Sequence, residues 1–356
     1  MEGDNELKKV FCIHPNIQDI NSFADYLGII DTDLIKSLEW DADNPTYLFV
    51  SEHIYLNLRM FKKFKKFINN EDIIKIYLAG ECIAPDMNLF DYAIVFDREL
   101  KDMDRIVRFP PTILHKKSIF QASNELDVST AKNLLKNKNR FCCFIYSNKN
   151  AHPMRDKLFY EISKYKQVDS LGKHLHNVTI KSSRTDNNWR KLSVEMKSQY
   201  KFSIASENAS YEGYTSEKLF SSFQAHTVPI YWGNPYVANE FNEKAFVNCA
   251  KFDNFDDLIS LIKKIDENDD IWCEMVTQPW QTEEQVITSK KEVEKYYLFI
   301  NRIFEQDIKN AHRIPLGTYP SRYREFFARN RMMLLIKYSK VGKAWDKLLS
   351  LIINKQ

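Results

Sequence analysis

The sequence predicts an α/β protein made of two Rossmann-like domains that face each other across a cleft. Short apolar runs alternate with amphipathic helical segments, which is typical of a parallel sheet with helices on its faces. A Lys/Asn cluster at residues 136–140 separates two such series, and 356 residues suffice for two cores. We find no internal repeat. The cleft between such domains is the default place for a substrate site.

The first series contains four apolar runs that read as strands and two helical segments between them. Glu81 follows the third run, at the edge of the sheet where site residues collect in open α/β domains. Residues 107–111 (VRFPP) read as irregular. The expected strands are 9–13, 47–50, 76–79 and 91–96, and the expected helices are 17–29 and 55–67.

The second series begins with a strand at 141–146 and a helix at 155–165, which Arg155 opens. A short strand at Val168 follows. Residues 200–235 then read as strand, polar loop, short helix and strand. Further helices are expected at 255–266 and 284–310.

The segment 200–235 is the most informative part of the chain, because its pattern predicts a phosphate-binding site. Its polar loop leads into a helix that the hydroxyl of Thr215 or Ser216 can cap. A helix N-terminus that follows a strand favours an anion, and Lys218 in the first turn adds a full positive charge. Glu217 would repel a phosphate, so we expect its carboxylate to face sugar hydroxyls.

Charge and cysteine content restrict the class of protein further. The net charge is +3, too small to indicate nucleic acid as a partner. Residues 321–356 carry a net charge of +7, so the rest of the chain is mildly acidic. The six cysteines lie mostly in apolar runs without metal-ligand spacing, which predicts buried, reduced thiols. No signal sequence or membrane span is recognisable, so the sequence predicts a cytoplasmic protein.

Two pairs of aspartates raise the alternative of a metal site. Asp31 and Asp33 follow an apolar run, and Asp41 and Asp43 come soon after. Two carboxylates on one loop can share Mn²⁺ or Mg²⁺ with a diphosphate. The favoured interpretation is instead that Asp31 or Thr32 caps the next helix and the remaining acids are solvated.

Three blocks of the sequence resemble the α1,3-fucosyltransferases of glycosyltransferase family 10. The stretch ENASYEGYTSEKLFSSFQAHTVPIYWGNP (207–235) resembles the donor-binding signature of that family. LAGECIAPDMNLFDYAIVFD (78–97) resembles the segment that carries the family's proposed base. FCCFIYSN (141–148) with RDKLFYEISKYKQVDSLGK (155–173) resembles the start of the donor domain. The blocks occur in the family's order.

The resemblance implies a GT-B fold and inverting transfer of L-fucose from GDP-β-L-fucose. The implied acceptor is O3 of GlcNAc in a Galβ1,4-GlcNAc unit of a bacterial surface glycan, such as a lipopolysaccharide O-antigen. It also implies the role of each candidate site residue. Glu81 is the expected general base, Arg155 and Lys218 the cations on departing GDP, Asn208 a phosphate donor, and Tyr214 and Glu217 ligands of sugar hydroxyls. No metal is obligatory in this mechanism, although Mn²⁺ or Mg²⁺ would stimulate it.

Alternatives within the same fold are an α1,4 linkage, another nucleotide-sugar donor, or a non-catalytic relative that binds glycans or membranes. The expected domains are an acceptor-binding domain (1–137), a GDP-fucose-binding domain (138–318), and a closing helix with a basic amphipathic tail (319–356). The tail has two interpretations. It attaches the protein to the cytoplasmic face of an inner membrane, or it packs back on the N-terminal domain with its basic residues in water.

Overall fold

The computed structural model describes residues 7–100, 104–111, 113, 126–178 and 189–339. The chain forms two compact units, and each is described here by itself. The first unit consists of Met1–Leu114 and Glu292–Gln356, and the second of His115–Lys291. Within the described ranges, no helix is both long and apolar enough to cross a membrane.

The first unit is built on a six-stranded parallel sheet in the order β2-β1-β3-β4-β5-β6. The chain crosses from β1 to the edge strand β2 and returns to β3, so the winding direction reverses between β1 and β3. Ligands of open α/β sheets bind at such a switch point. The strands are β1 (Lys8–Ile13), β2 (Leu38–Trp40), β3 (Tyr47–Ser51), β4 (Ile74–Leu78), β5 (Tyr92–Val95) and β6 (Ile106–Arg108).

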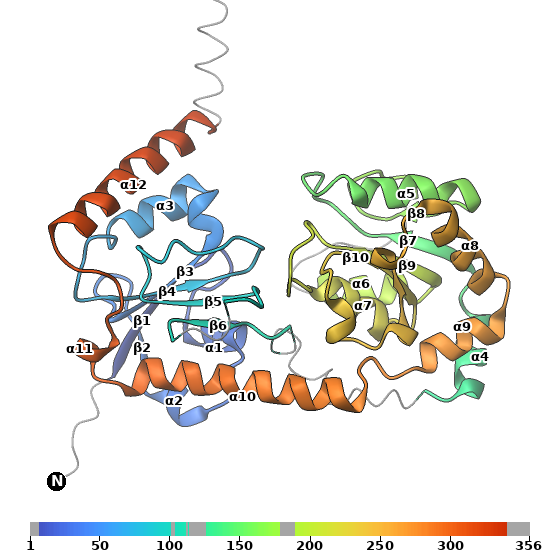
Figure 1. The fold of residues 1–356 in the computed structure, drawn as a ribbon, viewed down its shortest axis with the longest axis horizontal. Helices are drawn as coiled ribbons and strands as arrows, with labels where there is room; N and C mark the ends of the chain where they lie inside the picture. Colours follow the sequence, from blue (N-terminus) through green and yellow to red (C-terminus); the bar gives the residue numbers. More distant parts are fainter. Residues whose placement is uncertain (1–6, 101–103, 112, 114–125, 179–188, 340–356) are drawn as a thin grey trace, which may run out of the picture. The chain divides into compact units, whose positions relative to one another are not determined.

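Helices cover both faces of this sheet, as Figure 1 shows. One face carries α3 and α12, where Phe327 packs against Tyr55 and Phe61. The other carries α1, α2 and the part of α10 from Glu292 onward, where Phe304 packs against aromatic rings of β3. The C-terminal helices therefore return to the N-terminal domain, as predicted. The helices are α1 (Ile20–Leu27), α2 (Thr32–Lys36), α3 (Leu58–Lys65), α10 (Glu283–Glu305), α11 (Ile308–Ala311) and α12 (Thr318–Lys337).

The second unit contains a five-stranded parallel sheet in the order β11-β10-β9-β7-β8. Its switch point lies between β7 and β9, because the chain goes from β7 to β8 on one side and then to β9 on the other. The strands are β7 (Arg140–Phe144), β8 (Val168–Ser170), β9 (Tyr200–Ser206), β10 (Val228–Trp232) and β11 (Val247–Asn248).

Helices α5 and α8 cover one face of the second sheet, and α6 and α7 cover the other (Figure 1). Trp272 of α9 is fully buried and belongs to the same core as Ala131 of α4. This packing includes α4 in the second unit. The helices are α4 (Val128–Lys136), α5 (Met154–Tyr165), α6 (Trp189–Lys197), α7 (Glu217–Gln224), α8 (Phe255–Asp266) and α9 (Asp269–Thr277).

The predicted fold class, two α/β units with parallel sheets, is confirmed. Strands buried on both faces read as continuous apolar runs, which made most of them visible in the sequence. The prediction that residues 107–111 are irregular was wrong in part, because Ile106–Arg108 pairs with β5 as the edge strand β6. The two compact units divide at Leu114 and Glu292, whereas the sequence placed its domain boundaries after residues 137 and 318.

Candidate functional site

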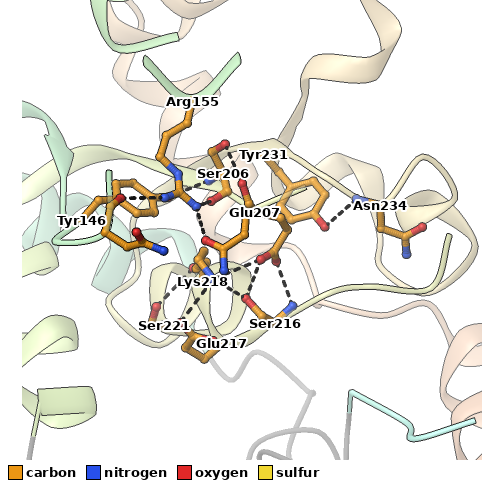
Figure 2. A network of polar contacts seen from close by, with 12 residues as sticks. Tyr146, Arg155, Ser206, Glu207, Ser216, Glu217, Lys218, Ser221, Tyr231 and Asn234 are labelled. Carbon is orange, nitrogen blue, oxygen red and sulfur yellow. Dashed lines mark hydrogen bonds and ion pairs between the residues drawn. The ribbon is translucent and has the colours of Figure 1, made fainter. Parts of the chain in front are cut away.

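The carboxyl ends of β7 and β9 meet at Arg155, which lies in the first turn of α5. This helix begins after Pro153, a residue whose fixed φ suits a helix start, and the His152 ring accepts a hydrogen bond from the Met154 amide. Arg155 donates to the Asn208 carboxamide oxygen at 2.6 Å and to the Ser206 carbonyl at 3.2 Å. Figure 2 shows its guanidinium beside the Tyr146 ring, whose centroid is 4.1 Å away.

Arg155 is a buried positive charge whose described hydrogen-bond acceptors are all neutral. Its exposed fraction is 1%. Within the described residues no carboxylate forms an ion pair with it, and its Nε has no hydrogen-bond partner. A buried charge without a counter-charge is costly, by several kcal/mol. The second unit therefore holds a cationic site that an anion would stabilise.

A second set of charges lies next to this site, where Glu207 and Lys218 form a buried ion pair. Glu207 follows β9 directly and is fully buried, and its Oε2 lies 3.1 Å from Lys218 Nζ. Ser216 donates to Glu207 through both its amide and its hydroxyl, at 2.8 and 2.6 Å (Figure 2). Burial opposes the charged form of Lys218, but the charges of Glu207 and Glu217 outweigh it and raise the pKa of Lys218 above its ordinary value.

This network corrects one detail predicted from the sequence. Ser216 occupies the N-cap position of α7, but its side chain makes no capping bond. Its hydroxyl and its amide both go to Glu207, because a fully buried carboxylate must find donors. The N-terminal end of α7, assigned to a phosphate from the sequence, thus already holds a carboxylate. The cations Arg155 and Lys218 are then the anion-attracting groups of this region.

The loop before α7 is held in place by Asn234, which is 1% exposed. Its carboxamide oxygen accepts from the amides of Gly213 and Tyr236, both at 3.0 Å, and its NH₂ group donates to Thr215 at 3.1 Å. Gly213 has a φ of +81°, which suits glycine. These bonds satisfy most of the hydrogen-bonding capacity of the Asn234 side chain and fix the loop that carries the candidate residues.

Glycine is also required at position 233, where the chain turns at the end of β10. A Cβ at Gly233 would lie 2.3 Å from Cγ of Glu207. Such a contact is impossible without movement of the buried carboxylate. The GNP turn after β10 therefore fits closely over the Glu207–Lys218 pair.

The six residues predicted from the sequence fall into two groups. Five belong to the second unit, at or near the network of Figure 2, and only Glu81 belongs to the first. Tyr214 is 2% exposed, whereas Asn208 and Glu217 are half-buried. Glu217 Oε1 lies 3.5 Å from Lys218 Nζ. The five candidate residues of the second unit are Arg155, Asn208, Tyr214, Glu217 and Lys218.

Glu81 lies in the turn after β4 and is half-buried. The amide of the preceding Gly80 donates to Glu52 at 2.8 Å, and the Glu81 carbonyl accepts from the Ile83 amide at 2.8 Å. The carboxyl edge of the first sheet thus presents this carboxylate on a turn with defined backbone bonds.

Sequence reasoning missed three residues of the second-unit network: Tyr146, Glu207 and Asn234. A signal for Glu207 was present, since an acid directly after a buried strand stands at the carboxyl edge of the sheet. Asn234, in a Gly-Asn-Pro turn after a strand, could have been noted as a turn residue. Nothing in the sequence indicated that Tyr146 would lie under the Arg155 guanidinium.

The aspartate pairs of the first unit have structural roles. Asp31 caps α2 by accepting from the amides of Asp33 and Leu34, as favoured from the sequence. Asp41 accepts from the amides of Asp43 and Asn44 and pairs with Lys9 at 3.2 Å. In the part of the chain that the structure describes, no three His, Cys, Asp or Glu side chains gather as a set of metal ligands.

Two parallel α/β units with polar residues at their switch points define the GT-B class of glycosyltransferase folds. A solved α1,3-fucosyltransferase with GDP-fucose superposes with a TM-score of 0.62, at 24% identity, over 86% of this chain and 93% of that chain. The family model described as glycosyltransferase family 10 (fucosyltransferase), C-terminal part, matches residues 135–307. The model of the α-(1,3)-fucosyltransferase FucT N-terminal domain matches residues 29–115. The chain therefore belongs to glycosyltransferase family 10.

Two relatives are similar at the sequence level. The α-(1,3)-fucosyltransferase FucT of Helicobacter pylori is 30% identical over 243 residues, which are 60% of this chain and 48% of that protein. The GDP-fucose protein O-fucosyltransferase 3 of Xenopus tropicalis is 32% identical over 152 residues, which are 41% of this chain and 31% of that protein. The chain thus spans less than half the length of these curated relatives.

The Glu207–Lys218 pair leads to a prediction about stability. Lys218→Met should lower the free energy of unfolding by about 3–5 kcal/mol, because it leaves a buried carboxylate without its cation. The double variant Glu207→Gln/Lys218→Met should cost clearly less than the sum of the two single changes. Urea unfolding followed by circular dichroism measures all three variants. Additive costs in this cycle would contradict a coupled pair.

Proposed function

We propose that the protein is an inverting fucosyltransferase that uses GDP-β-L-fucose as donor. The proposed acceptor atom is O3 of GlcNAc in a Galβ1,4-GlcNAc unit of a bacterial surface glycan such as a lipopolysaccharide O-antigen of the Lewis type. Membership of family 10 supports the reaction class. The acceptor rests on the α1,3-fucosyltransferase relatives and on the sequence blocks around Glu81.

One observation supports the donor site most strongly: Arg155 is buried at the switch point of the second sheet without a counter-charge among the described residues. A diphosphate is an anion that this site would hold, and the Lys218 ammonium lies in the adjoining network. Lys218 keeps its charge because its pKa is raised. The Lys218 ammonium would therefore remain protonated while the leaving group departs.

The proposed chemistry assigns one task to each residue. Glu81 takes the proton from the acceptor hydroxyl as its oxygen bonds to C1 of fucose. The bond from C1 to the phosphate oxygen breaks, and Arg155 and Lys218 offset the charge that GDP gains. The NH₂ group of Asn208, whose oxygen already binds Arg155, donates to phosphate.

The remaining assignments concern sugar hydroxyls and metal ions. Tyr214 and Glu217 bind hydroxyls of the ribose or of fucose, since a carboxylate accepts from hydroxyl groups. Two cations on the diphosphate supply the charge that a metal supplies in other glycosyltransferases. We therefore propose that no metal is obligatory and that added Mn²⁺ or Mg²⁺ only stimulates turnover.

A second candidate acceptor is a hydroxyl group on a protein. The similarity to GDP-fucose protein O-fucosyltransferase 3 favours it, although that match covers 41% of the chain. The donor chemistry is the same in both cases. The acceptor assay below therefore includes a protein acceptor.

We also propose that the protein acts in the cytoplasm, on the surface of an inner membrane that α12 contacts. One side of α12 packs on the first unit through Arg324, which is buried and donates to Glu71 at 3.0 Å. The other side exposes aromatic and aliphatic groups beside Arg322, Arg329 and Lys337, a composition that suits an anionic bilayer. The exposed apolar residues of this side are Tyr319, Phe326, Met333, Leu334 and Ile336, with Tyr338 after the end of the helix, whereas the exposed Tyr323 donates its hydroxyl to Asp86 of the first unit. Residues 340–356 of the predicted tail lie outside the described residues.

Arg155→Ala should weaken GDP binding about tenfold to hundredfold, because a charged hydrogen-bonding group is lost from the diphosphate site. Isothermal titration calorimetry with GDP measures the affinity. Arg155→Lys is the matched control, since it keeps the charge but not the forked geometry, and it should fall between wild type and Arg155→Ala. GDP affinity equal to wild type in Arg155→Ala would remove Arg155 from the donor site.

Incubation with GDP-fucose and N-acetyllactosamine should give a product whose α1,3 linkage is read by NMR. Glu81→Gln should lower kcat by about 10²-fold to 10⁴-fold, the usual contribution of a general base, with GDP-fucose affinity unchanged. A parallel reaction with a folded protein acceptor tests the second candidate. Transfer to protein alone would exclude the glycan acceptor, and full turnover in Glu81→Gln would exclude Glu81 as the base.

The full chain should sediment with vesicles that contain phosphatidylglycerol and not with pure phosphatidylcholine vesicles. A chain truncated before Met332 should sediment less with the anionic vesicles, because it loses exposed apolar groups and Lys337. Phe326→Ser tests the part of α12 that remains. Equal and negligible pelleting of all forms on both vesicles would exclude membrane attachment.

A further inference from the structure

A second group of charged side chains lies at the switch point of the first sheet. His14 follows β1, Glu52 and His53 begin the 3₁₀ helix η1 (Glu52–Tyr55) after β3, and Glu81 follows β4. Because the sheet is parallel, these four positions come to the same edge. His14 and Glu52 are buried, whereas His53 and Glu81 are half-buried. The mechanism proposed above uses only Glu81.

Glu52 contacts the turn that carries Glu81. Its side chain is fully buried, and Oε2 accepts the Gly80 amide at 2.8 Å. Gly80 lies so close that a Cβ there would be 3.0 Å from Glu52 Oε1 and 3.2 Å from the Tyr26 hydroxyl. The backbone immediately before Glu81 thus contacts the buried Glu52 carboxylate directly.

The far side of the same turn is fixed as well. The Ile83 amide donates to the Glu81 carbonyl, and the hydroxyl of the fully buried Tyr77 donates to the Ile83 carbonyl at 2.7 Å. Tyr77 supports the end of the turn and Glu52 its start. Loss of the Glu52 contact would free the start of the turn, next to Glu81.

The counter-charge of Glu52 among the described residues is His53, whose Nδ1 lies 3.2 Å from Oε1. The Ser51 hydroxyl is 3.3 Å from the same ring nitrogen. A carboxylate buried this completely needs either a cation or a proton. The energetic cost of burying the Glu52 carboxylate therefore depends on whether His53 carries its second proton.

The groups around His53 favour its charged form. Interaction with the Glu52 carboxylate raises the pKa of His53 above its usual 6.5, burial opposes the rise, and the charge of Glu81 adds to it. His14, with its ring centroid 5.7 Å from that of His53 and 4.7 Å from that of Tyr26, stays neutral. Burial and the nearby His53 lower the pKa of His14 to about 4.

We propose that Glu52 is a positioning residue for the catalytic base Glu81, and that protonated His53 is the counter-charge that holds the Glu52 carboxylate in contact with Gly80. This inference rests on the proposed function, since it takes Glu81 as the base. Glu52 acts through the backbone of Gly80 and need not touch the substrate. The pair thereby makes the presentation of the base depend on the protonation of a histidine.

The direction of the pH dependence follows from the raised pKa of His53. The stabilisation from the pair is complete below the unfolded value of about 6.5 and is lost as pH rises through the folded value. Above that pH the buried Glu52 has lost its cation, and the turn that carries Glu81 loosens. We therefore expect kcat to fall on the alkaline side, while binding of GDP by the second unit is unaffected.

Two substitutions at Glu52 test the proposal. Glu52→Ala removes the acceptor of the Gly80 amide and should lower kcat about tenfold to hundredfold, the cost of a misplaced base. The KM for GDP-fucose should stay at the wild-type value. Glu52→Gln keeps an acceptor without the charge, so it should recover kcat to within about threefold and lose the alkaline decline. Glu39→Gln, an exposed glutamate of the same unit, is the control for charge removal.

His53→Gln completes a double-mutant cycle with Glu52→Gln. Alone it should give low turnover that no longer varies with pH, like wild type at alkaline pH. Combined with Glu52→Gln it should cost little, because a neutral Glu52 needs no cation. Wild-type kcat in Glu52→Ala, or an unchanged alkaline decline in Glu52→Gln, would overturn the proposal.

Hydrogen exchange separates failure of this inference from failure of the proposed function. The Gly80 amide should be protected in the wild type and exchange faster in Glu52→Ala, measured well below the melting temperature of both proteins. If the wild type transfers no fucose, the proposed function fails, yet the exchange result still decides whether Glu52 holds the turn. An equally protected Gly80 amide in Glu52→Ala would overturn the positioning role directly.

Discussion

The second unit depends on how it accommodates three charges at one buried edge of a sheet. Glu207 and Lys218 compensate each other, whereas Arg155 has only neutral partners among the described residues. The pair is stable because Ser216 supplies two further donors to the carboxylate. A buried guanidinium without a counter-charge is costly, so this imbalance favours an anion, such as the leaving group of the proposed reaction.

The two units use the same device to hold their functional loops. In each, a fully buried glutamate after a strand accepts a backbone amide, from Ser216 to Glu207 and from Gly80 to Glu52. The counter-charges differ. The raised pKa of Lys218 keeps its ammonium charged, whereas His53 is a histidine whose pKa the Glu52 carboxylate raises above its ordinary value. The donor loop is thus held independently of pH, and the turn of the proposed base is not.

Local sequence rules predicted the elements more successfully than the contacts. The sequence identified eight strands, mostly as apolar runs, because parallel strands are buried on both faces, and Asp31 was one of the two residues expected to cap a helix. The three-residue strands β2 and β6 escaped, since so short a run carries little periodicity, although β8, of the same length, was expected at Val168. By the same rules Ser216 was expected to cap α7, but its hydroxyl donates to the buried Glu207 carboxylate instead. The six candidate site residues remain predictions until the assays above are made.

The sequence by itself determined the two-domain α/β class, the family and the types of residue available for the chemistry. These follow from local patterns of apolar, polar and glycine residues, which single segments carry. Only the tertiary structure decided that Glu207 neutralises Lys218, that Arg155 has only neutral partners among the described residues, and that Glu52 contacts the turn of Glu81. Such pairings join segments 11 to 53 residues apart in the chain. Burial decides their energy, and burial is a property of the packed fold rather than of any segment.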